Sequence, residues 1–515
     1  MITDERAPVL ESGGIKKQIP KSFCILPWIH MEVKPTGAVK MCCVSAREVE
    51  IGNDGKKRPA VVGVDAFGDI WNSEYMQKVR QAMLEGRPVR DCTHCQKQAA
   101  SSMTTFGELN NREWMLRFST SLDGLRDYAA QRGTIVNAPP PYLQMSLGNE
   151  CNLKCRMCNS DYSSRIEEDP VHNRWAPNSR ATSREHSTTW FKDDDLFVAE
   201  LIPDPKIIRK LYITGGEPML SDRLRRILDL LIEHGTQRDV EIGLNTNGTV
   251  ANRRLLDRLV QFKSGFLGCS IDGFAQYYEY IRFPGKWSMV LNSLERFREY
   301  PTLSVEFNPT IQAYNALNID ELYRFCDERD MFCSPQIMYN PEHLTISVLP
   351  FAARQAAAAR LRSFIASPAT TAKQKRNREL AVPVADYLEH AAQPSNYAHL
   401  AREFAVFTND LDRSRGQNFK DTHRELYDYF ISSGAGWTEE VRYSQSATAG
   451  TPEERAMLRH CELQLERYRR QGGTPWIFRP RAWLARMRRN ALRKRLARAS
   501  REGNGQGGAA KADPL

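Results

Sequence analysis

The sequence predicts an α/β fold: a partial (β/α)6 barrel or an open α/β sheet, with a small cysteine-rich α+β module before it and a helical extension after it. Between 141 and 345, short apolar runs alternate with segments of helical periodicity, which predicts βαβ units and a parallel sheet. Cysteines cluster ahead of this region and again in its first loop. After about 345 the strand signal fades, and Ala-rich, charged segments predict helices.

Length and composition place the chain among globular proteins. Its 515 residues predict two to four domains, and 41% hydrophobic with 26% charged residues exclude wholesale disorder. No apolar run approaches the roughly 18 residues of a transmembrane helix. The start, MITDERAPVL, lacks the basic and then apolar pattern of a signal peptide, so we expect a cytoplasmic protein without a transmembrane segment.

The net charge of +10 comes from one segment. Residues 479–501 hold ten Arg and Lys and no Asp or Glu, which equals the whole excess of 72 basic over 62 acidic residues. The chain as a whole is therefore not a basic nucleic-acid binder. The tail alone could contact RNA, an acidic partner or an anionic membrane surface, and a solvated basic helix is the alternative interpretation.

Composition shifts divide the chain. The run APPPY at 138–142 indicates a linker, because successive prolines fit neither a helix nor a sheet ladder. We expect a flexible arm at 1–20, the cysteine-bearing module at 21–110, a helical linker at 111–140, the barrel at 141–345, a helical extension at 346–475, and a basic helix with a disordered tail at 476–515.

Within the barrel region, strands and helices can be assigned from periodicity. The expected strands are 143–147, 210–214, 240–245, 266–271, 303–311 and 333–338. One helix runs from Asp222 to a terminating Gly235, and the next begins at a capping Asn252. A third stacks Val290 and Leu294 on one face, whereas 160–205 is an insertion rich in Ser, Asp and Arg. Helical segments are expected at 351–366, 374–391, 395–405, 420–431 and 452–470.

Three cysteines follow the first expected strand. Cys151, Cys155 and Cys158 form a C-x3-C-x2-C pattern at the strand end where α/β proteins carry their ligand sites. In a cytosolic protein, clustered cysteines more often hold metal than form disulfides. Three thiolates can hold three irons of a [4Fe–4S] cluster and leave the fourth iron open to a small chelating cofactor. Zinc, which usually takes four ligands, and core packing are the alternatives.

This arrangement resembles the radical S-adenosylmethionine (SAM) superfamily. That family usually has a bulky apolar or aromatic residue before the third cysteine, where this chain has Met157. A second marker, ITGGEP, follows the second expected strand, and its glycines allow backbone to approach a ligand closely. In the family the matching motif binds the amino group of SAM, which implies this role for Gly215, Gly216, Glu217 and Pro218.

Two less specific motifs lie at the ends of the third and fourth expected strands. By resemblance, Asn245 in NTNG and both Ser270 and Asp272 in SIDG are candidates for contacts to the ribose and carboxylate of SAM. The alternative is ordinary turn chemistry, because Asn-Gly and Asp-Gly are favoured in turns.

The N-terminal module resembles the SPASM/twitch auxiliary-cluster module of radical SAM enzymes. We expect two short strands around a turn at Gly37 and a helix at 73–86 that leads to the closing C-x2-C. Its five cysteines fit one four-ligand [4Fe–4S] cluster, with Cys24, Cys42, Cys92 and Cys95 as the expected ligands. Cys43 could replace Cys42, and a four-cysteine zinc ribbon is the alternative site. Such modules usually follow the barrel, whereas this one precedes it.

The resemblance implies a chemistry. SAM would be cleaved reductively to a 5′-deoxyadenosyl radical that abstracts hydrogen from a substrate C–H, with the auxiliary [4Fe–4S] cluster assisting electron transfer. It also implies a flavodoxin- or ferredoxin-type electron donor and, as one substrate class, peptides or natural products. No general acid–base dyad can be named from the sequence. The competing hypothesis is a non-catalytic zinc or iron–sulfur regulator that binds nucleic acid, although such a protein has no need of GGEP.

Overall fold

The computed structural model describes residues 23–52, 57–100, 104–175, 202, 204–434 and 436–443. The expected arm, the helix at 452–470, the basic tail and most of the 160–205 insertion lie outside the described residues. Within these residues, no helix is long and apolar enough to cross a membrane.

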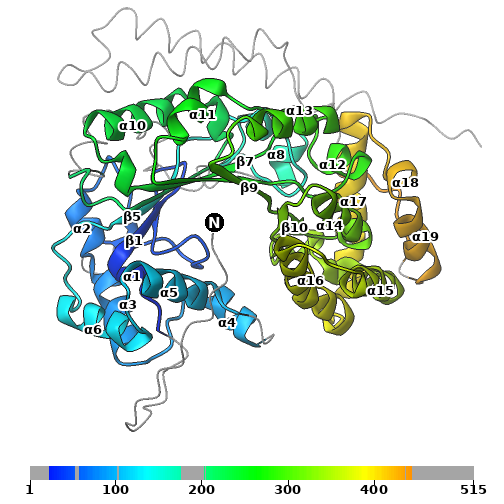
Figure 1. Ribbon diagram of the computed structural model, residues 1–515. Coiled ribbons are helices and arrows are strands. Elements are labelled where there is room, and N and C mark those ends of the chain that lie inside the picture. Colours follow the sequence, from blue (N-terminus) through cyan, green and yellow to red (C-terminus); the bar gives the residue numbers. More distant parts are fainter. Residues whose placement is uncertain are drawn as a thin grey trace, which may run out of the picture.

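The centre of the molecule is one eight-stranded sheet, which curves through the middle of Figure 1. Its strand order is β11-β9-β8-β7-β6-β5-β1-β2, and every neighbouring pair is parallel except β1 with β2. The barrel strands are β5 (Tyr142–Ser146), β6 (Lys210–Thr214), β7 (Glu241–Thr246), β8 (Ser264–Cys269), β9 (Leu303–Phe307) and β11 (Phe332–Cys333). Six parallel strands in chain order confirm the predicted partial (β/α)6 barrel.

Two of the expected strands are each broken by a proline. The run expected at 303–311 divides into β9 and β10 (Thr310–Ile311), with Pro309 between them. The run expected at 333–338 divides into β11 and β12 (Gln336–Ile337), with Pro335 between them. Proline has no N–H to donate to a ladder, so the sheet cannot continue through it. The outer pieces, β10 and β12, pair with one another instead.

Helices cover the outer face of the sheet. Figure 1 shows α10, α11 and α13 along this face, with the N-terminal module and the C-terminal helices flanking the sheet at its two ends. The helices of the barrel region are α7 (Ser164–Glu167), α8 (His172–Trp175), α10 (Asp222–Glu233), α11 (Arg253–Leu259), α12 (Gln276–Ile281), α13 (Trp287–Arg298) and α14 (Ile319–Glu328). Leu224, Ile227, Leu228 and Leu231 of α10 are all buried, as the sequence periodicity predicts.

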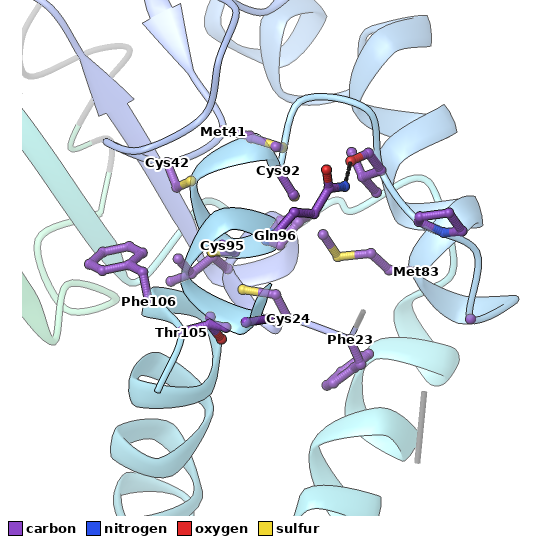
Figure 2. A pocket seen from close by; sticks show the side chains of 17 residues that line it. Phe23, Cys24, Met41, Cys42, Met83, Cys92, Cys95, Gln96, Thr105 and Phe106 are labelled. Atoms are coloured by element: carbon purple, nitrogen blue, oxygen red, sulfur yellow. Dashed lines mark hydrogen bonds between the residues drawn. The ribbon is translucent and has the colours of Figure 1, made fainter. Parts of the chain in front are cut away.

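The N-terminal module joins the barrel sheet. Strand β1 (His30–Val33) pairs in parallel with β5, and β2 (Val39–Lys40) pairs antiparallel with β1 around the turn at Gly37. The remaining elements are α1 (Leu26–Ile29), the β3 (Glu50–Ile51) and β4 (Arg58–Pro59) hairpin, α2 (Phe67–Trp71), α3 (Glu74–Leu84), α4 (Thr93–Ala100), α5 (Phe106–Arg117) and α6 (Leu122–Arg132). They enclose a cavity lined by four cysteines (Figure 2).

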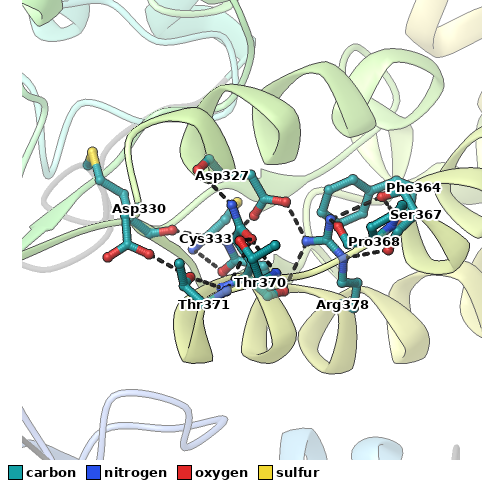
Figure 3. Close-up of polar contacts among 12 residues, drawn as sticks. Asp327, Asp330, Cys333, Phe364, Ser367, Pro368, Thr370, Thr371 and Arg378 are labelled. Carbon is teal, nitrogen blue, oxygen red and sulfur yellow. Dashed lines mark hydrogen bonds and ion pairs between the residues drawn. The ribbon is translucent and has the colours of Figure 1, made fainter.

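The C-terminal extension is helical, as predicted. Its helices are α15 (Phe351–Ala366), α16 (Ala372–His390), α17 (Tyr397–Arg415), α18 (Phe419–Thr422) and α19 (Arg424–Ser432). Helix α16 covers the open edge of the sheet at β11 (Figure 3). There Asn377 Oδ1 accepts a hydrogen bond from the Cys333 N–H at 2.9 Å, and Arg378 forms an ion pair with Asp327. A helix side chain thus takes the place of a missing neighbouring strand.

Candidate functional site

The three-cysteine loop and the GGEP turn meet at the carboxyl ends of β5 and β6. The Glu217 N–H donates to the Glu150 carbonyl at 2.7 Å, which holds the turn directly against the residue before Cys151. Gly216 has a φ of 56°, and a Cβ at this position would collide with the same carbonyl. Only glycine fits both this backbone conformation and this close approach.

Glu217 connects the turn to the end of β7. Its carboxylate is 2% exposed and accepts from the Met219 N–H at 2.9 Å, the Thr246 hydroxyl at 2.7 Å and the Asn247 N–H at 2.6 Å. Burial raises the pKa of Glu217, and these three donors and nearby Arg282 oppose that rise. Glu217 is therefore a fixed acceptor at the mouth of the barrel.

The three thiols lie in one electrostatic neighbourhood. Burial raises the pKa of Cys151 to about 12 and also raises the pKa values of Cys155 and Cys158, with the neighbouring cysteines contributing at Cys151 and Cys158. Thiols in such surroundings stay protonated until a metal displaces the proton. No three His, Cys, Asp or Glu side chains among the described residues converge on a single ion site. A four-iron cube binds each thiolate at a different corner and so needs thiols farther apart.

A buried ion pair supports Cys155. Arg282 Nη1 donates to Cys155 Sγ at 3.6 Å, and its Nε donates to Asp272 Oδ2 at 2.7 Å. Asp272 is fully buried, and its other oxygen accepts from the Thr310 N–H at 2.8 Å. The carboxylate therefore orients Arg282 toward the thiol. The sequence analysis did not single out Arg282, because nothing in its spacing connects it to the cysteine loop.

The C-terminal extension reaches the same loop through Arg156. This guanidinium is fully buried, pairs with Asp412 of α17 and donates to Gln417 Oε1 at 3.0 Å. It also lies over the Tyr280 ring at 3.7 Å, and the Tyr280 hydroxyl donates to Asp412 at 2.7 Å. Helix α17 thus anchors the backbone between the second and third cysteines. Sequence reasoning missed this link, because 256 residues separate the two charges.

The other predicted SAM contacts lie around this mouth. Gly215 has a φ of 78° beside Ser146, and Pro218 is buried at the start of the 3-10 turn Pro218–Leu220. Asn245 Oδ1 accepts from the Tyr212 hydroxyl at 2.7 Å, and the Ser270 N–H donates to the Thr246 carbonyl at 2.8 Å. Ser270 is linked to Glu217 through Thr246, whose hydroxyl donates to that carboxylate, whereas the carboxylate of Asp272 faces Arg282.

The expected auxiliary ligands surround one cavity of about 430 Å³. Figure 2 shows Cys24, Cys42, Cys92 and Cys95 around it, with Met41, Met83 and Phe106 among its apolar walls. Burial is the main cause of the raised pKa of each thiol, which reaches about 12 at Cys42 and Cys92. Backbone N–H groups that stabilise the charged form face Cys24, Cys42 and Cys95.

Cys43 points elsewhere. It does not line the cavity, and its electrostatic neighbours are Glu32, Cys42 and Lys40 together with three tyrosines, namely Tyr142, Tyr162 and Tyr212. This supports Cys42 over Cys43 as the fourth auxiliary ligand. Cys269, Cys326 and Cys333 are buried core residues, and Cys461 lies outside the described residues.

Comparison with known families agrees with this geometry. The radical SAM superfamily matches residues 145–326, and the SPASM iron–sulfur cluster-binding domain matches 24–96. GTP 3′,8-cyclase of Sulfurimonas denitrificans is 27% identical over 106 residues, which cover 21% of this chain and 27% of that protein. Pre-heme d1 synthase of Dinoroseobacter shibae is 25% identical over 228 residues, covering 44% and 50%. The chain thus spans half or less of these relatives.

Solved structures include similar chains at low identity. The anSMEcpe structure with bound AdoMet is 16% identical with a TM-score of 0.32, covering 44% of this chain and 58% of that one. Streptococcus suis SuiB bound to the precursor peptide SuiA is 13% identical with a TM-score of 0.31, covering 57% and 65%.

The two matched domains imply the cofactors: a [4Fe–4S] cluster with SAM for the barrel, and auxiliary iron–sulfur binding for the N-terminal module. The donor sets fit these groups, since three thiols share the barrel mouth and four line one cavity. Residues 145–326 are therefore a radical SAM domain, and residues 24–96 are a SPASM iron–sulfur cluster-binding domain that precedes it.

Proposed function

We propose that this enzyme cleaves SAM reductively, that the resulting 5′-deoxyadenosyl radical abstracts hydrogen from a substrate C–H, and that an auxiliary [4Fe–4S] cluster assists electron transfer. The observation that carries this proposal is the Glu217 N–H bond to the Glu150 carbonyl at 2.7 Å. It brings the amine-binding motif and the three-cysteine loop to the same strand ends, as binding of one chelating cofactor requires.

In this proposal each group of residues has a distinct task. Cys151, Cys155 and Cys158 hold the first cluster, whereas Cys24, Cys42, Cys92 and Cys95 hold the second. The Gly215–Pro218 turn lets backbone approach SAM, with Glu217 as a buried acceptor for its amino group. Asn245 and Ser270, at the ends of β7 and β8, are proposed to contact the rest of SAM, and Asp272 is proposed to act through Arg282.

The substrate and partners follow from the resemblance to SPASM and twitch enzymes. We propose a peptide or natural product as substrate and a flavodoxin- or ferredoxin-type protein as reductant. A cytoplasmic location would keep the cysteines reduced and available to bind iron.

The test is anaerobic reconstitution, iron counting and chromatographic detection of 5′-deoxyadenosine after addition of SAM and dithionite. We expect about eight irons per chain, as two four-iron cubes require. Replacing Cys151, Cys155 and Cys158 together by Ala should abolish 5′-deoxyadenosine and remove about four irons.

The matched control is Cys326→Ala, which changes a buried cysteine of α14 outside both sites and should keep iron and cleavage. Cleavage that persists in the triple variant contradicts the proposal. Zinc in place of iron, without 5′-deoxyadenosine, would favour the regulatory alternative.

A further inference from the structure

The two faces of the barrel sheet differ in chemistry. On β6, β7 and β8 the residues Leu211, Ile213, Leu244 and Leu267 have no exposed surface and belong to the hydrophobic core. Successive strand residues point to opposite faces, so Tyr212, Asn245, Phe266 and Glu306 share the other face. The apolar set faces the covering helices, which Figure 1 shows on one side of the sheet, because a Cβ on Gly265, on the face of Leu267, would lie 3.6 Å from the Leu259 carbonyl of α11; the second set therefore faces away from them. It presents polar and aromatic side chains to the interior of the barrel.

Two of these residues, Asn245 and Glu306, form one row across adjacent strands with Gly268 between them. Asn245 of β7 pairs with Gly268 of β8, and Gly268 pairs with Glu306 of β9. A Cβ on Gly268 would lie 2.7 Å from the Asn308 amide and 2.9 Å from Asn245 Oδ1. The absence of a side chain at Gly268 therefore lets the two amides approach from either side, next to Glu306.

Among the described residues, Glu306 has a carboxylate without a cationic partner. In the orientation that satisfies its neighbours, the Asn308 amide donates to Glu306 Oε1 at 3.0 Å. Across the described ranges, no Lys, Arg or His forms an ion pair with Glu306. Burial raises its pKa to about 7, and only Asn308 opposes that rise. A ligand that brings a positive charge and N–H donors would stabilise the ionised form of a half-buried carboxylate that has only one amide partner.

Two aromatic rings lie on the same face of the sheet, on strands to one side of this carboxylate, and the Tyr212 hydroxyl is close enough to Glu306 for the two to interact electrostatically. Tyr212 and Phe266 are stacked with ring centroids 6.4 Å apart. Gly243 lies between them in the sheet, and a Cβ there would lie 2.5 Å from Tyr212 Cδ2 and 3.5 Å from Phe266 Cδ1. Aromatic faces attract cations through the ring quadrupole. A carboxylate next to two such faces favours an organic cation over a neutral or anionic group.

The row of Asn245, Gly268 and Glu306 lies next to the residues that bind Glu217 of the GGEP turn. Asn245 is followed directly by Thr246 and Asn247, which bond both oxygens of Glu217. A group bound at Glu306 would therefore lie deeper in the barrel than the GGEP turn, by one row of side chains.

We propose that Glu306, with Asn308, Asn245, Tyr212 and Phe266, binds a positively charged group of the substrate, of primary amine or guanidine chemistry. The inference rests on the proposed function, because it places the substrate beside the SAM site. Glu306 sets the charge of the group, and the faces of the two rings add to its attraction for the cation. Asn245 then stands between substrate and cofactor.

The test uses probes that share one apolar body and differ in charge. Butylammonium, butylguanidinium and butanol are titrated by calorimetry into the reconstituted enzyme with SAM and without reductant. We expect saturable binding of both cations and at least tenfold weaker binding of butanol. Glu306→Gln should weaken the cations at least tenfold, whereas Glu328→Gln, an exposed acid on α14, should change nothing.

Three outcomes overturn the inference: butanol binding as tightly as the cations, cation binding that survives Glu306→Gln, or no binding of either cation. If Glu306→Gln fails to fold, Phe266→Leu serves instead and should weaken the cations severalfold while leaving butanol unchanged. Failure of the inference and failure of the proposed function are distinguishable. A wild-type enzyme that releases no 5′-deoxyadenosine refutes the function, whereas one that releases it but binds no cation refutes only this site.

Discussion

The Arg282 contact predicts how the reduction potential of the cluster that Cys155 is proposed to hold should change on mutation. The double variant Asp272→Asn, Arg282→Gln removes the guanidinium donor to Cys155 Sγ, now at 3.6 Å, and keeps the net charge unchanged. Changing both partners avoids a buried unpaired charge, which would cost about 3–5 kcal/mol in stability. The measured effect should therefore report the lost hydrogen bond.

The magnitude follows from the strength of such a bond. A hydrogen bond that involves a charged group contributes about 1.5–3 kcal/mol. If about half of it is gained only on reduction, the reduced state loses about 1 kcal/mol, which corresponds to a shift of about 40 mV for a one-electron couple. The shift should be toward more negative potential, because a donor to the thiolate stabilises the reduced cluster.

The assay is an anaerobic redox titration followed by electron paramagnetic resonance, with iron content measured in parallel. Arg253→Gln is the control, since this arginine forms an exposed ion pair with Glu299 on the outer helices. An unchanged potential in a double variant that retains its iron would refute the reasoning. A positive shift would mean that the lost charges outweigh the lost bond.

Three further changes test the sites. Asp412→Ala removes the partner of the buried Arg156 guanidinium in the cysteine loop and should lower the free energy of unfolding by about 3–5 kcal/mol. Denaturant titration measures this loss, and a loss below about 1 kcal/mol would contradict the anchoring role of Asp412. Gly216→Ala should abolish SAM binding measured by calorimetry, whereas Gly235→Ala, at a similar φ with open space, should preserve it; equal binding in both variants would argue against the close approach. Cys42→Ala should lose about four irons and Cys43→Ala none, and the reverse result would reassign the ligand.

Local patterns made most of the barrel predictable. Strand β6 coincides with its expected range, and the capping Asn252 accepts from the Arg254 N–H, because period, caps and turns are encoded over a few residues. The three-cysteine loop and GGEP were identifiable because strand ends in a parallel sheet share one edge. The fold class and the cofactors are confirmed, whereas the domain boundaries and the individual site residues stay predictions.

Long-range contacts were not predictable. The pairing of β1 with β5 joins residues more than 100 positions apart, and no local pattern indicates which strand receives an edge. The same holds for Asp412 and for Arg282, whose partners are set by tertiary packing. Glu306 has one weak sequence signal as a functional residue, since it is the one charged residue of the otherwise apolar or small strand β9. A charged residue is unusual in a parallel strand, because such strands are usually buried.

The continuous ladder from β2 to β11 has a consequence for the relative placement of the two cysteine sites. Cys24 and Cys42 flank two strands that belong to the same sheet as the barrel, so main-chain hydrogen bonds fix the position of the four-cysteine cavity relative to the three-cysteine loop. A one-residue slip of β1 against β5 would turn the β1 side chains to the opposite face of the sheet and displace the thiols of the four-cysteine cavity. The length of the segment that joins β1 to β5 therefore matters only through its effect on this pairing register.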